Sequence, residues 1–231
     1  KEAYGHFTVC QNLVPNFKDV AAQLELSKSK ATTTVMLEPI PMHSYQLKLS
    51  NEFFENKIRE SMGRIPVGNF VRFYHPNEAE LAGTKITDQL IRLSFDDFII
   101  GQTMVKETIV PCKNDSVVIS KDSTGKPVYG TVTAELHQFS KVVVSSGLLD
   151  FKIVDCKSRA TLTQEKFPGT YNWGCEWAYY NGDSRALTNK QLDLTKNKEL
   201  IPPPPQQLFI EFCKPIHEQV CNKIKSFYSN Y

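Results

Sequence analysis

The side chains best suited to chemistry gather in one stretch of this 231-residue sequence, residues 167–187. The stretch holds both tryptophans of the chain. On a helix, Trp173, Trp177 and Tyr180 would share one face, because they are four and three residues apart. On a strand, Trp173 and Trp177 would instead share a face with Tyr179. In either geometry, aromatic rings would line one face of the element.

Three interpretations of this stretch remain open. The rings can form a sugar-stacking platform with nearby polar side chains, or a hot-spot patch for a protein partner, since such patches are rich in Trp, Tyr and Arg. They can also close the core of a sheet, while Gly182 and Asp183 make a turn in which the Asp183 carboxylate accepts backbone hydrogen bonds. The candidate partner- or ligand-binding residues are Trp173, Glu176, Trp177, Tyr180, Asp183 and Arg185.

Recognised catalytic patterns are absent from the sequence. It contains no Gly-rich phosphate loop, no G-x-S-x-G nucleophile motif, no H-E-x-x-H motif and no EF-hand loop. The five histidines fall on different predicted elements, and His43 is the one in an irregular, proline-bounded loop, where functional residues concentrate. We therefore expect a protein that is not an enzyme and has no catalytic residue.

The cysteines give no sign of a metal site. All six are spread along the chain, without a C-x-x-C pair or a Cys/His cluster of metal-ligand spacing. Cys213 and Cys221 fall in one predicted helix, where their spacing places them about 12 Å apart, beyond the reach of a disulfide. The sequence predicts no metal, no cofactor, and cysteines that act as small buried hydrophobic residues.

Composition sets broad limits on the class of protein. The chain is 41% hydrophobic and 23% charged, which is enough apolar content for at least one core. Its 27 Lys and Arg against 25 Asp and Glu leave a formal charge of only +2, so no nucleic-acid partner is expected. No apolar run approaches the ~18–20 residues of a transmembrane helix, and the first residues lack the apolar segment of a signal peptide. We expect either a cytosolic protein or a processed export product.

Periodic apolar residues predict helices before and after a long polar and β-branched middle section. Residues 1–30 indicate a helical hairpin of the tetratricopeptide kind, broken at Pro15. A second helical segment is predicted over residues 50–62, capped by Ser50 and ended by Gly63. Its expected inward side chains are Phe53, Phe54, Ile58 and Met62.

The final residues predict an amphipathic helix that is integral to the core. Residues 202–205 are four prolines, which should form an extended strap leading to this helix. Pro215 should kink the helix or divide it, because its ring does not fit a regular helix interior. The periodic apolar residues are Leu208, Phe209, Phe212, Ile216, Val220, Ile224 and Phe227.

Alternating apolar residues between the helices predict an antiparallel meander. The expected strands lie near residues 32–37, 69–74, 88–95, 98–101, 104–110, 116–120, 128–144, 147–155 and 160–167. The predicted fold class is α+β, with an N-terminal helical hairpin followed by a mainly antiparallel sheet, packed with the helix near 50–62 and the C-terminal helix. We expect two domains, residues 1–30 and residues 31–231.

The motifs of the aromatic stretch carry a family resemblance. Phe167-Pro168 to Trp173, Glu176-Trp177-Ala178 and Gly182-Asp183-x-Arg185-Ala186-Leu187 resemble the pattern of an uncharacterised family of Bacteroidota cell-envelope proteins, commonly encoded as lipoproteins. Three further segments are similar to that family: Tyr4 to Val20 to its last tetratricopeptide-like unit, Val35 to Phe54 to its strand, loop and helix, and Gly147 to Asp155 to its paired central strands.

The resemblance implies a location and a kind of partner. It implies the periplasmic face of an outer membrane, with membrane attachment only through an N-terminal anchor that this chain does not contain. It carries over no functional residue. We expect a non-enzymatic envelope protein that acts through protein–protein interaction, as an accessory subunit of an outer-membrane assembly. The alternative is a carbohydrate-binding or carbohydrate-processing envelope protein that uses residues 171–187.

Overall fold

The computed structural model describes residues 1–15, 17–41, 47–74, 87–229 and 231. The chain divides into two compact units. Unit 1 comprises residues 1–98, 147–169 and 209–231, and unit 2 comprises residues 99–146 and 170–208. The predicted domain boundary at residue 30 stays a prediction.

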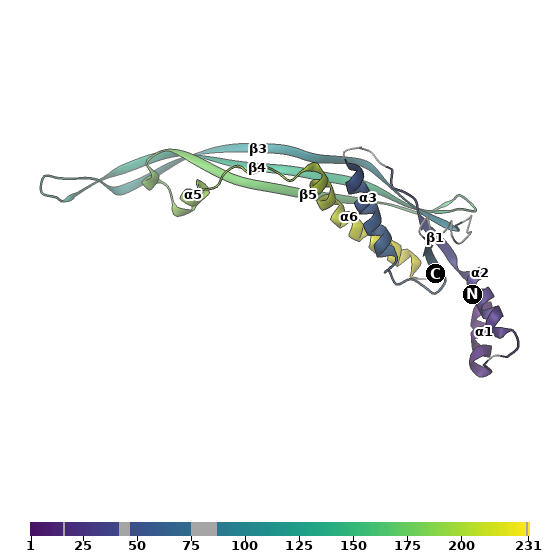
Figure 1. The fold of residues 1–231 in the computed structure, drawn as a ribbon. Helices are drawn as coiled ribbons and strands as arrows, with labels where there is room; N and C mark the ends of the chain where they lie inside the picture. The colour runs from purple at the N-terminus through teal and green to yellow at the C-terminus, as the bar shows by residue number, and fades with distance from the viewer. Residues whose placement is uncertain (16, 42–46, 75–86, 230) are drawn as a thin grey trace. The chain divides into compact units, whose positions relative to one another are not determined.

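The helices and strands of the described residues give an α+β fold, as the sequence predicts (Figure 1). The helices are α1 (Glu2–Leu13), α2 (Val20–Ala31), α3 (Lys48–Met62), η2 (Ser184–Ala186, a 3-10 helix), α5 (Asn189–Leu194) and α6 (Pro205–Tyr228). The strands are β1 (Thr33–Leu37), β2 (Val71–Tyr74), β3 (Gln89–Lys121), β4 (Pro127–Asp155) and β5 (Thr161–Gly182).

The sheet has the strand order β2-β1-β3-β4-β5 and is mixed. β1 is parallel to both of its neighbours, with Val35 opposite Phe73 of β2 and Gln89 of β3. Parallel neighbours need a crossover connection, and α3 lies between β1 and β2 along the chain. β3, β4 and β5 follow one another through short turns, closed by the hydrogen bonds Asp122 N to Lys126 O and Asp155 N to Ala160 O, both 2.9 Å.

Helices α3 and α6 supply most of the helical side of the unit 1 core. Ser61 on α3 and His217 on α6 join the two helices, with 2.9 Å between Oγ and Nε2. Two aromatic side chains of α6, Phe209 and Phe212, pack against Phe95 of β3. The buried strand residues of this core include Val35, Leu37, Ile91, Leu93, Phe95, Leu149, Phe151, Ile153 and Phe167.

The predicted helix at residues 50–62 exists, but two details of it are wrong. α3 begins at Lys48 after Leu47, without a side-chain cap, and Ser50 is a buried residue of the helix. Phe53 is 50% exposed, because the inward side chains follow the four-residue spacing of Phe54, Ile58 and Met62 instead.

The predicted C-terminal helix is confirmed and contributes to the core. Pro215 lies inside one helix, α6, and does not divide it into two. Phe209, Phe212, Ile216, Val220 and Ile224 are all buried. The residue that continues their pattern is Tyr228, which is fully buried, while Phe227 is only half-buried.

The N-terminal hairpin has the predicted helix–turn–helix form. α1 ends at Leu13, two residues before Pro15, and α2 begins at Val20. No residue of α1 is buried, and Val20 is the buried residue of α2. The Tyr4 ring makes an edge-on contact with Phe70, with 5.3 Å between centroids. The tetratricopeptide character of this hairpin stays a prediction.

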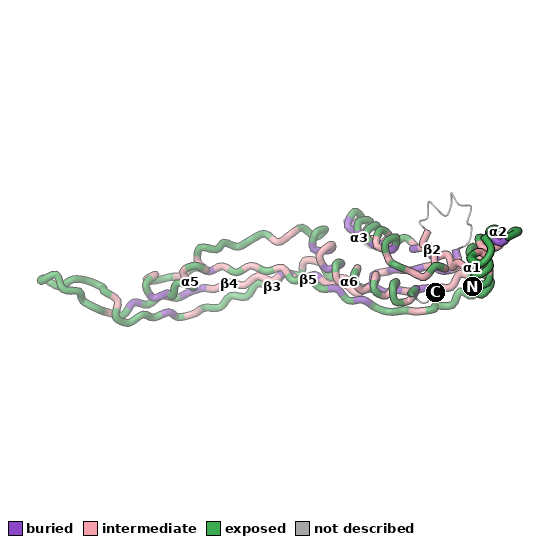
Figure 2. Tube along the Cα trace, turned by 90° about the horizontal axis from the view of Figure 1, so that it is seen from below, coloured by how far each residue is buried: buried purple, intermediate pink, exposed green. Residues whose placement is uncertain are grey.

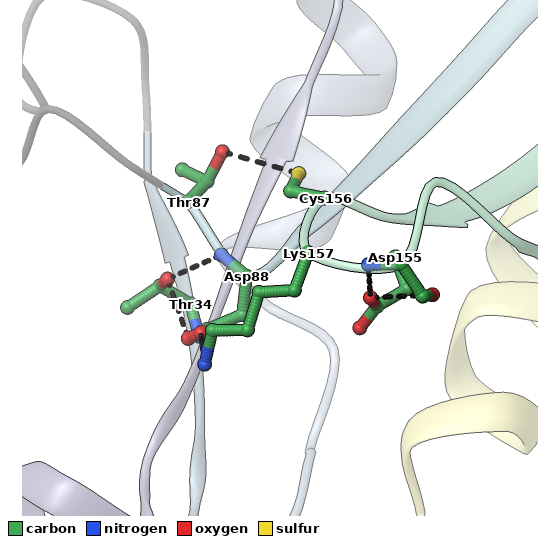
Figure 3. A network of polar contacts seen from close by, with 7 residues as sticks. Thr34, Thr87, Asp88, Asp155, Cys156 and Lys157 are labelled. Carbon is green, nitrogen blue, oxygen red and sulfur yellow. Dashed lines mark hydrogen bonds and ion pairs between the residues drawn. The ribbon is translucent and has the colours of Figure 1, made fainter.

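A polar network fastens the start of β3 to β1 and to the turn between β4 and β5 (Figure 3). The Asp88 carboxylate accepts hydrogen bonds from the backbone N and Oγ1 of Thr34, at 3.0 and 2.9 Å, and forms an ion pair with Lys157 at 3.2 Å. Partial burial raises the pKa of Asp88, but the bonds from Thr34 and Lys157 outweigh it and hold the pKa below its ordinary value. The network therefore favours an ionised Asp88.

Candidate binding face of unit 2

In unit 2, the strands β3, β4 and β5 form a ribbon with α5 against one of its faces (Figure 1). Leu192 and Leu194 of α5 pack against a small core that the strands and the η2 region share. Side chains alternate between the two faces of a strand, so the neighbours of these core residues point to the opposite face. The small core consists of Cys112, Val132, Ala134, Leu136, Ala178, Ala186 and Leu187.

The opposite face carries a row of stacked rings. His137 of β4 stacks on Tyr179 of β5, with 4.5 Å between centroids and 8° between planes. Phe139 of β4 stacks on Trp177 of β5 at 5.3 Å and 8°, and on Tyr179 at 5.8 Å and 24°. We call the side chains of this row and the two carboxylates beside it the aromatic face: Glu107, Glu135, His137, Phe139, Trp177 and Tyr179.

The two carboxylates of the aromatic face hold both nitrogens of the His137 ring. Nδ1 lies 2.8 Å from Glu107 Oε1 of β3, and Nε2 lies 3.0 Å from Glu135 Oε1. Ionised carboxylates only accept hydrogen bonds, so both ring nitrogens can be satisfied together only if both carry protons. The hydrogen bond to Glu107 is the main cause that raises the pKa of His137, and Glu135 adds to it. This arrangement favours an imidazolium ion.

Much of the aromatic face and its surroundings is open to solvent. Tyr179 is 48% exposed, and Trp177 and Phe139 are half-buried. Val105 and Ile109 lie two residues on either side of Glu107 on β3, which places them on the same face. They are 55% and 53% exposed. Apolar and aromatic side chains that share an exposed face are typical of a binding surface.

The structure separates the predicted site residues between the two faces. Trp177 belongs to the aromatic face, and Trp173 is half-buried four residues earlier on the same strand. Tyr180 instead packs against the small core on the α5 side. Glu176 is exposed, and its backbone oxygen accepts a hydrogen bond from Asn197 Nδ2 at 3.2 Å. Of the two geometries that the sequence leaves open, the segment adopts the strand.

Asp183 and Arg185 form a turn with each other, as one of the three interpretations predicts. The Asp183 carboxylate accepts a hydrogen bond from the Arg185 backbone N at 2.9 Å and pairs with its guanidinium at 2.6 Å. Arg185 also donates from Nη1 to the Val118 oxygen at 2.8 Å. The guanidinium and the backbone bond lower the pKa of Asp183 to about 2. These contacts occupy polar atoms that a ligand would otherwise use.

Sequence reasoning missed four members of the aromatic face as site residues: Glu107, Glu135, His137 and Phe139. One local signal existed, because Glu135, His137 and Phe139 alternate and must share a face on a strand. The contact with Glu107 depends on how β3 and β4 are aligned, and a single sequence does not reveal that alignment.

A second cluster of reactive side chain types lies between α3 and α6. His217 Nε2 is 2.9 Å from Ser61 Oγ and 3.6 Å from Cys221 Sγ. Burial lowers the pKa of His217 and raises that of Cys221, which disfavours a reactive thiolate. Cys10, Cys112, Cys156, Cys175, Cys213 and Cys221 are all free.

The described part of the chain offers neither a metal-ligand cluster nor a membrane-spanning helix. Within it, no group of three or more His, Cys, Asp or Glu side chains could hold a metal ion. Within the same residues, no helix is both long and apolar enough to cross a membrane. His43, the histidine that the sequence places in an irregular loop, lies outside the described residues.

Comparison with known proteins yields distant structural likenesses. No protein-family model matches the chain, and no curated protein matches it. The chain is similar to a structure assigned as a neuraminyllactose-binding hemagglutinin homolog from Helicobacter pylori, with a TM-score of 0.35 and 11% identity over 87% of this chain and 91% of that chain. It is also similar to a minor lipoprotein from Acinetobacter baumannii, with a TM-score of 0.26 and 10% identity over 84% of this chain and 94% of that chain.

A third structure shows a similar TM-score and a similar sequence identity. A structure assigned as a lipoprotein from Caulobacter crescentus has a TM-score of 0.26 and 9% identity over 87% of this chain and 95% of that chain. Two of these three structures are thus assigned as bacterial lipoproteins. Likenesses with such TM-scores and identities establish neither a family nor a function for this chain.

Proposed function

We propose that this chain is a non-enzymatic cell-envelope protein that binds another protein through the aromatic face of unit 2. The observation that carries the proposal is the row of stacked rings, with Tyr179 exposed and Trp177 and Phe139 half-buried, beside the exposed side chains of Val105 and Ile109. Aromatic side chains dominate the binding energy of protein interfaces, and a contiguous apolar face in a folded unit marks a binding site. The sequence resemblance to envelope proteins supports the location and an accessory role in an outer-membrane assembly.

The way the rings stack favours a protein over a sugar. A sugar ring stacks on the open face of an aromatic ring. Here the planes of His137 and Tyr179, and those of Phe139 and Trp177, are only 8° apart, so each ring covers one face of its partner. The row therefore offers fewer open ring faces than a flat platform, while its edges and the nearby aliphatic side chains suit the mixed surface of a protein.

Site-specific photocrosslinking from the aromatic face tests the proposal. A benzophenone amino acid in place of Tyr179 should crosslink a discrete protein chain in envelope preparations, and mass spectrometry would identify it. The matched control is the same replacement at Tyr129, which is 61% exposed in unit 2 and lies outside the aromatic face. Crosslinking from Tyr179 should disappear when Trp177→Ala is added.

Two outcomes contradict the proposal. The first is equal crosslinking from Tyr179 and Tyr129, which would mean nonspecific contact. The second is the absence of a Tyr179 crosslink together with glycan-array binding that depends on Trp177. That result would favour the carbohydrate-binding alternative.

A further inference from the structure

We propose that the partner of the aromatic face is a cationic polypeptide segment, which pairs in extended form with the edge of β5 and places a Lys or Arg side chain against Trp177 or Tyr179. This inference rests on the proposed function, because it names the chemistry of the partner that the same face would bind. Three observations carry it: the charge of the face, the stacking of the two rings on residues of β4 alone, and the position of β5 in the sheet.

The charges of the aromatic face are complementary to a cation. Glu107 and Glu135 contribute two negative charges, and their side chains are 45% and 57% exposed. The single positive charge of the face, on His137, belongs to a side chain that is only 11% exposed. The net charge of the face is therefore −1, and its exposed part is the negative part. An acidic partner would be repelled and a basic partner attracted.

Among the described residues, Trp177 and Tyr179 carry stacked rings on their β4 side only, so their other sides face the edge of the sheet. Phe139 and His137, both on β4, cover the inner sides of Trp177 and Tyr179. The outer sides of these two rings thus lie on the side of β5 that is away from β4. A guanidinium or ammonium group is attracted to the face of Trp and Tyr rings. A cation beside β5 would meet both these ring faces and the carboxylates nearby.

The edge of β5 suits an extended segment. β5 is the last strand in the sheet order of the described residues, so one of its sides has no strand partner there. An extended peptide can add to such an edge through main-chain hydrogen bonds, while every second side chain points to the same face. Asn197 occupies the backbone oxygen of Glu176. The backbone groups of successive strand residues point alternately to the two sides of the strand, so pairing would involve Gly174 and Ala178, two residues to either side of Glu176.

Protonation of His137 provides an independent check on the charge argument. The groups that face His137 are Glu107 from β3, Glu135 from its own strand and the Tyr179 ring from β5. Loss of the imidazolium proton changes the net charge of the face from −1 to −2. Affinity for a cationic segment should therefore rise as the pH rises through the pKa of His137, which lies above its ordinary value.

Fluorescence anisotropy with dye-labelled peptides tests the inference. The probes are three five-residue peptides of alternating sequence, Val-X-Val-X-Val, in which X is Arg, Gln or Glu. The Arg peptide should bind the full chain about five- to tenfold more tightly than the Gln peptide, and the Glu peptide should bind least. Glu135→Gln should remove most of this preference. Glu176→Gln, a change of an exposed carboxylate on the same ribbon but outside the aromatic face, should leave the preference unchanged.

The possible negative results distinguish the proposal of a cationic partner from the proposal that the aromatic face binds a protein. Equal affinity for the Arg and Gln peptides, or an Arg preference that survives Glu135→Gln, would overturn the cationic partner. A Tyr179 crosslink to a protein segment without Lys or Arg would also overturn it, yet that result would support protein binding by the aromatic face. If Trp177→Ala changes neither peptide affinity nor crosslinking while far-UV circular dichroism shows a folded chain, the proposed function itself is wrong.

Discussion

His137 makes more polar and aromatic side-chain contacts than its neighbours on the aromatic face, since its ring contacts two carboxylates and stacks on the ring of Tyr179. Such a ring links β3, β4 and β5 at one point of the ribbon. Its effect depends on a proton, because a neutral imidazole can donate to only one of the two carboxylates. The stability of the ribbon should therefore depend on the protonation of His137.

The first prediction concerns the stability of unit 2 as the pH rises. The folded-state pKa of His137 is raised above 6.5, the ordinary value of histidine. A raised pKa means that the stabilisation is fully present below about pH 6.5 and is lost as the pH rises through the folded-state value. The melting temperature of the wild type should fall relative to that of His137→Phe between pH 6 and pH 9. Parallel pH profiles for the two proteins would contradict the prediction.

The second prediction concerns Asp183, whose pKa is lowered to about 2 by Arg185. Its contribution to stability is present above the unfolded-state pKa and is lost as the pH falls toward 2. NMR titration of the Asp183 carboxyl carbon should give a midpoint near 2, and Arg185→Gln should return the midpoint toward 3.8, the ordinary value. An unchanged midpoint in Arg185→Gln would show that the guanidinium is not the cause.

At the scale of the elements, α6 approaches β5 so closely that one position has no room for a side chain. A Cβ atom on Gly169 would meet the backbone oxygen of Phe212 and lie 2.7 Å from Ile216 Cγ1. Neither the helix backbone nor a fully buried isoleucine can move aside easily. Gly169 thus sets the distance between strand and helix.

The third prediction follows from this close approach. Gly169→Ala should lower the free energy of unfolding of unit 1 by about 1–3 kcal/mol, the usual cost of overpacking. Gly5→Ala is the matched control, because its added Cβ meets nothing within 4 Å apart from its chain neighbours and the backbone of its own helix, and Ala is favoured over Gly in a helix. It should raise helix stability by up to about 1 kcal/mol. Urea denaturation of both variants measures the difference, and equal effects would contradict the packing argument.

Sequence patterns predicted the kinds of elements better than their lengths. The sequence predicts separate strand segments at residues 88–95, 98–101, 104–110 and 116–120, whereas the structure has one strand, β3, over almost all of these residues. Gly101 and Ser116 take positive φ values of 73° and 71° inside β3, a conformation that bulges use. Polar and glycine residues thus indicated breaks where the strand continues, because pairing with a neighbouring strand overrides local preference.

The candidate site shows the same limit of prediction from the sequence. Trp177 stood out by residue type, but its ring partners Phe139 and His137 lie on another strand. Asp183 and Arg185 also stood out, yet they satisfy each other within a turn. A sequence reveals which side chains are chemically capable. Which of them meet depends on contacts between residues that are distant along the chain.

At the scale of the whole molecule, the amount of buried core differs along the three long strands. Near the β3–β4 turn, most residues are exposed and are coloured green in Figure 2. β5 ends at Gly182, where Asp183 N donates to Thr133 O, so β3 and β4 continue beyond it as a pair. A two-stranded ribbon without a covered face is only marginally stable.

The fourth prediction is a gradient of hydrogen exchange along these strands. Amides of residues 115–121 and 127–131 should exchange fastest, and those of residues 89–95 and 149–153, next to the core of unit 1, should exchange slowest. Mass spectrometry of peptides from timed exchange would measure the gradient. Uniform protection over the whole of β3 would contradict the prediction and indicate a partner or a single cooperative unit.

The course of the chain between the two units has a consequence for synthesis on the ribosome. The chain passes from one unit to the other after residues 98, 146, 169 and 208, so unit 2 is complete once residue 208 has been made. Unit 1 still lacks residues 209–231, which supply Phe212, Ile216 and Ile224 to its core. Although its first strand and helices emerge earliest, unit 1 must leave apolar strand surface uncovered until α6 emerges. A chaperone that shields nascent apolar surface would therefore act on unit 1, and the ribbon of unit 2 can form before it.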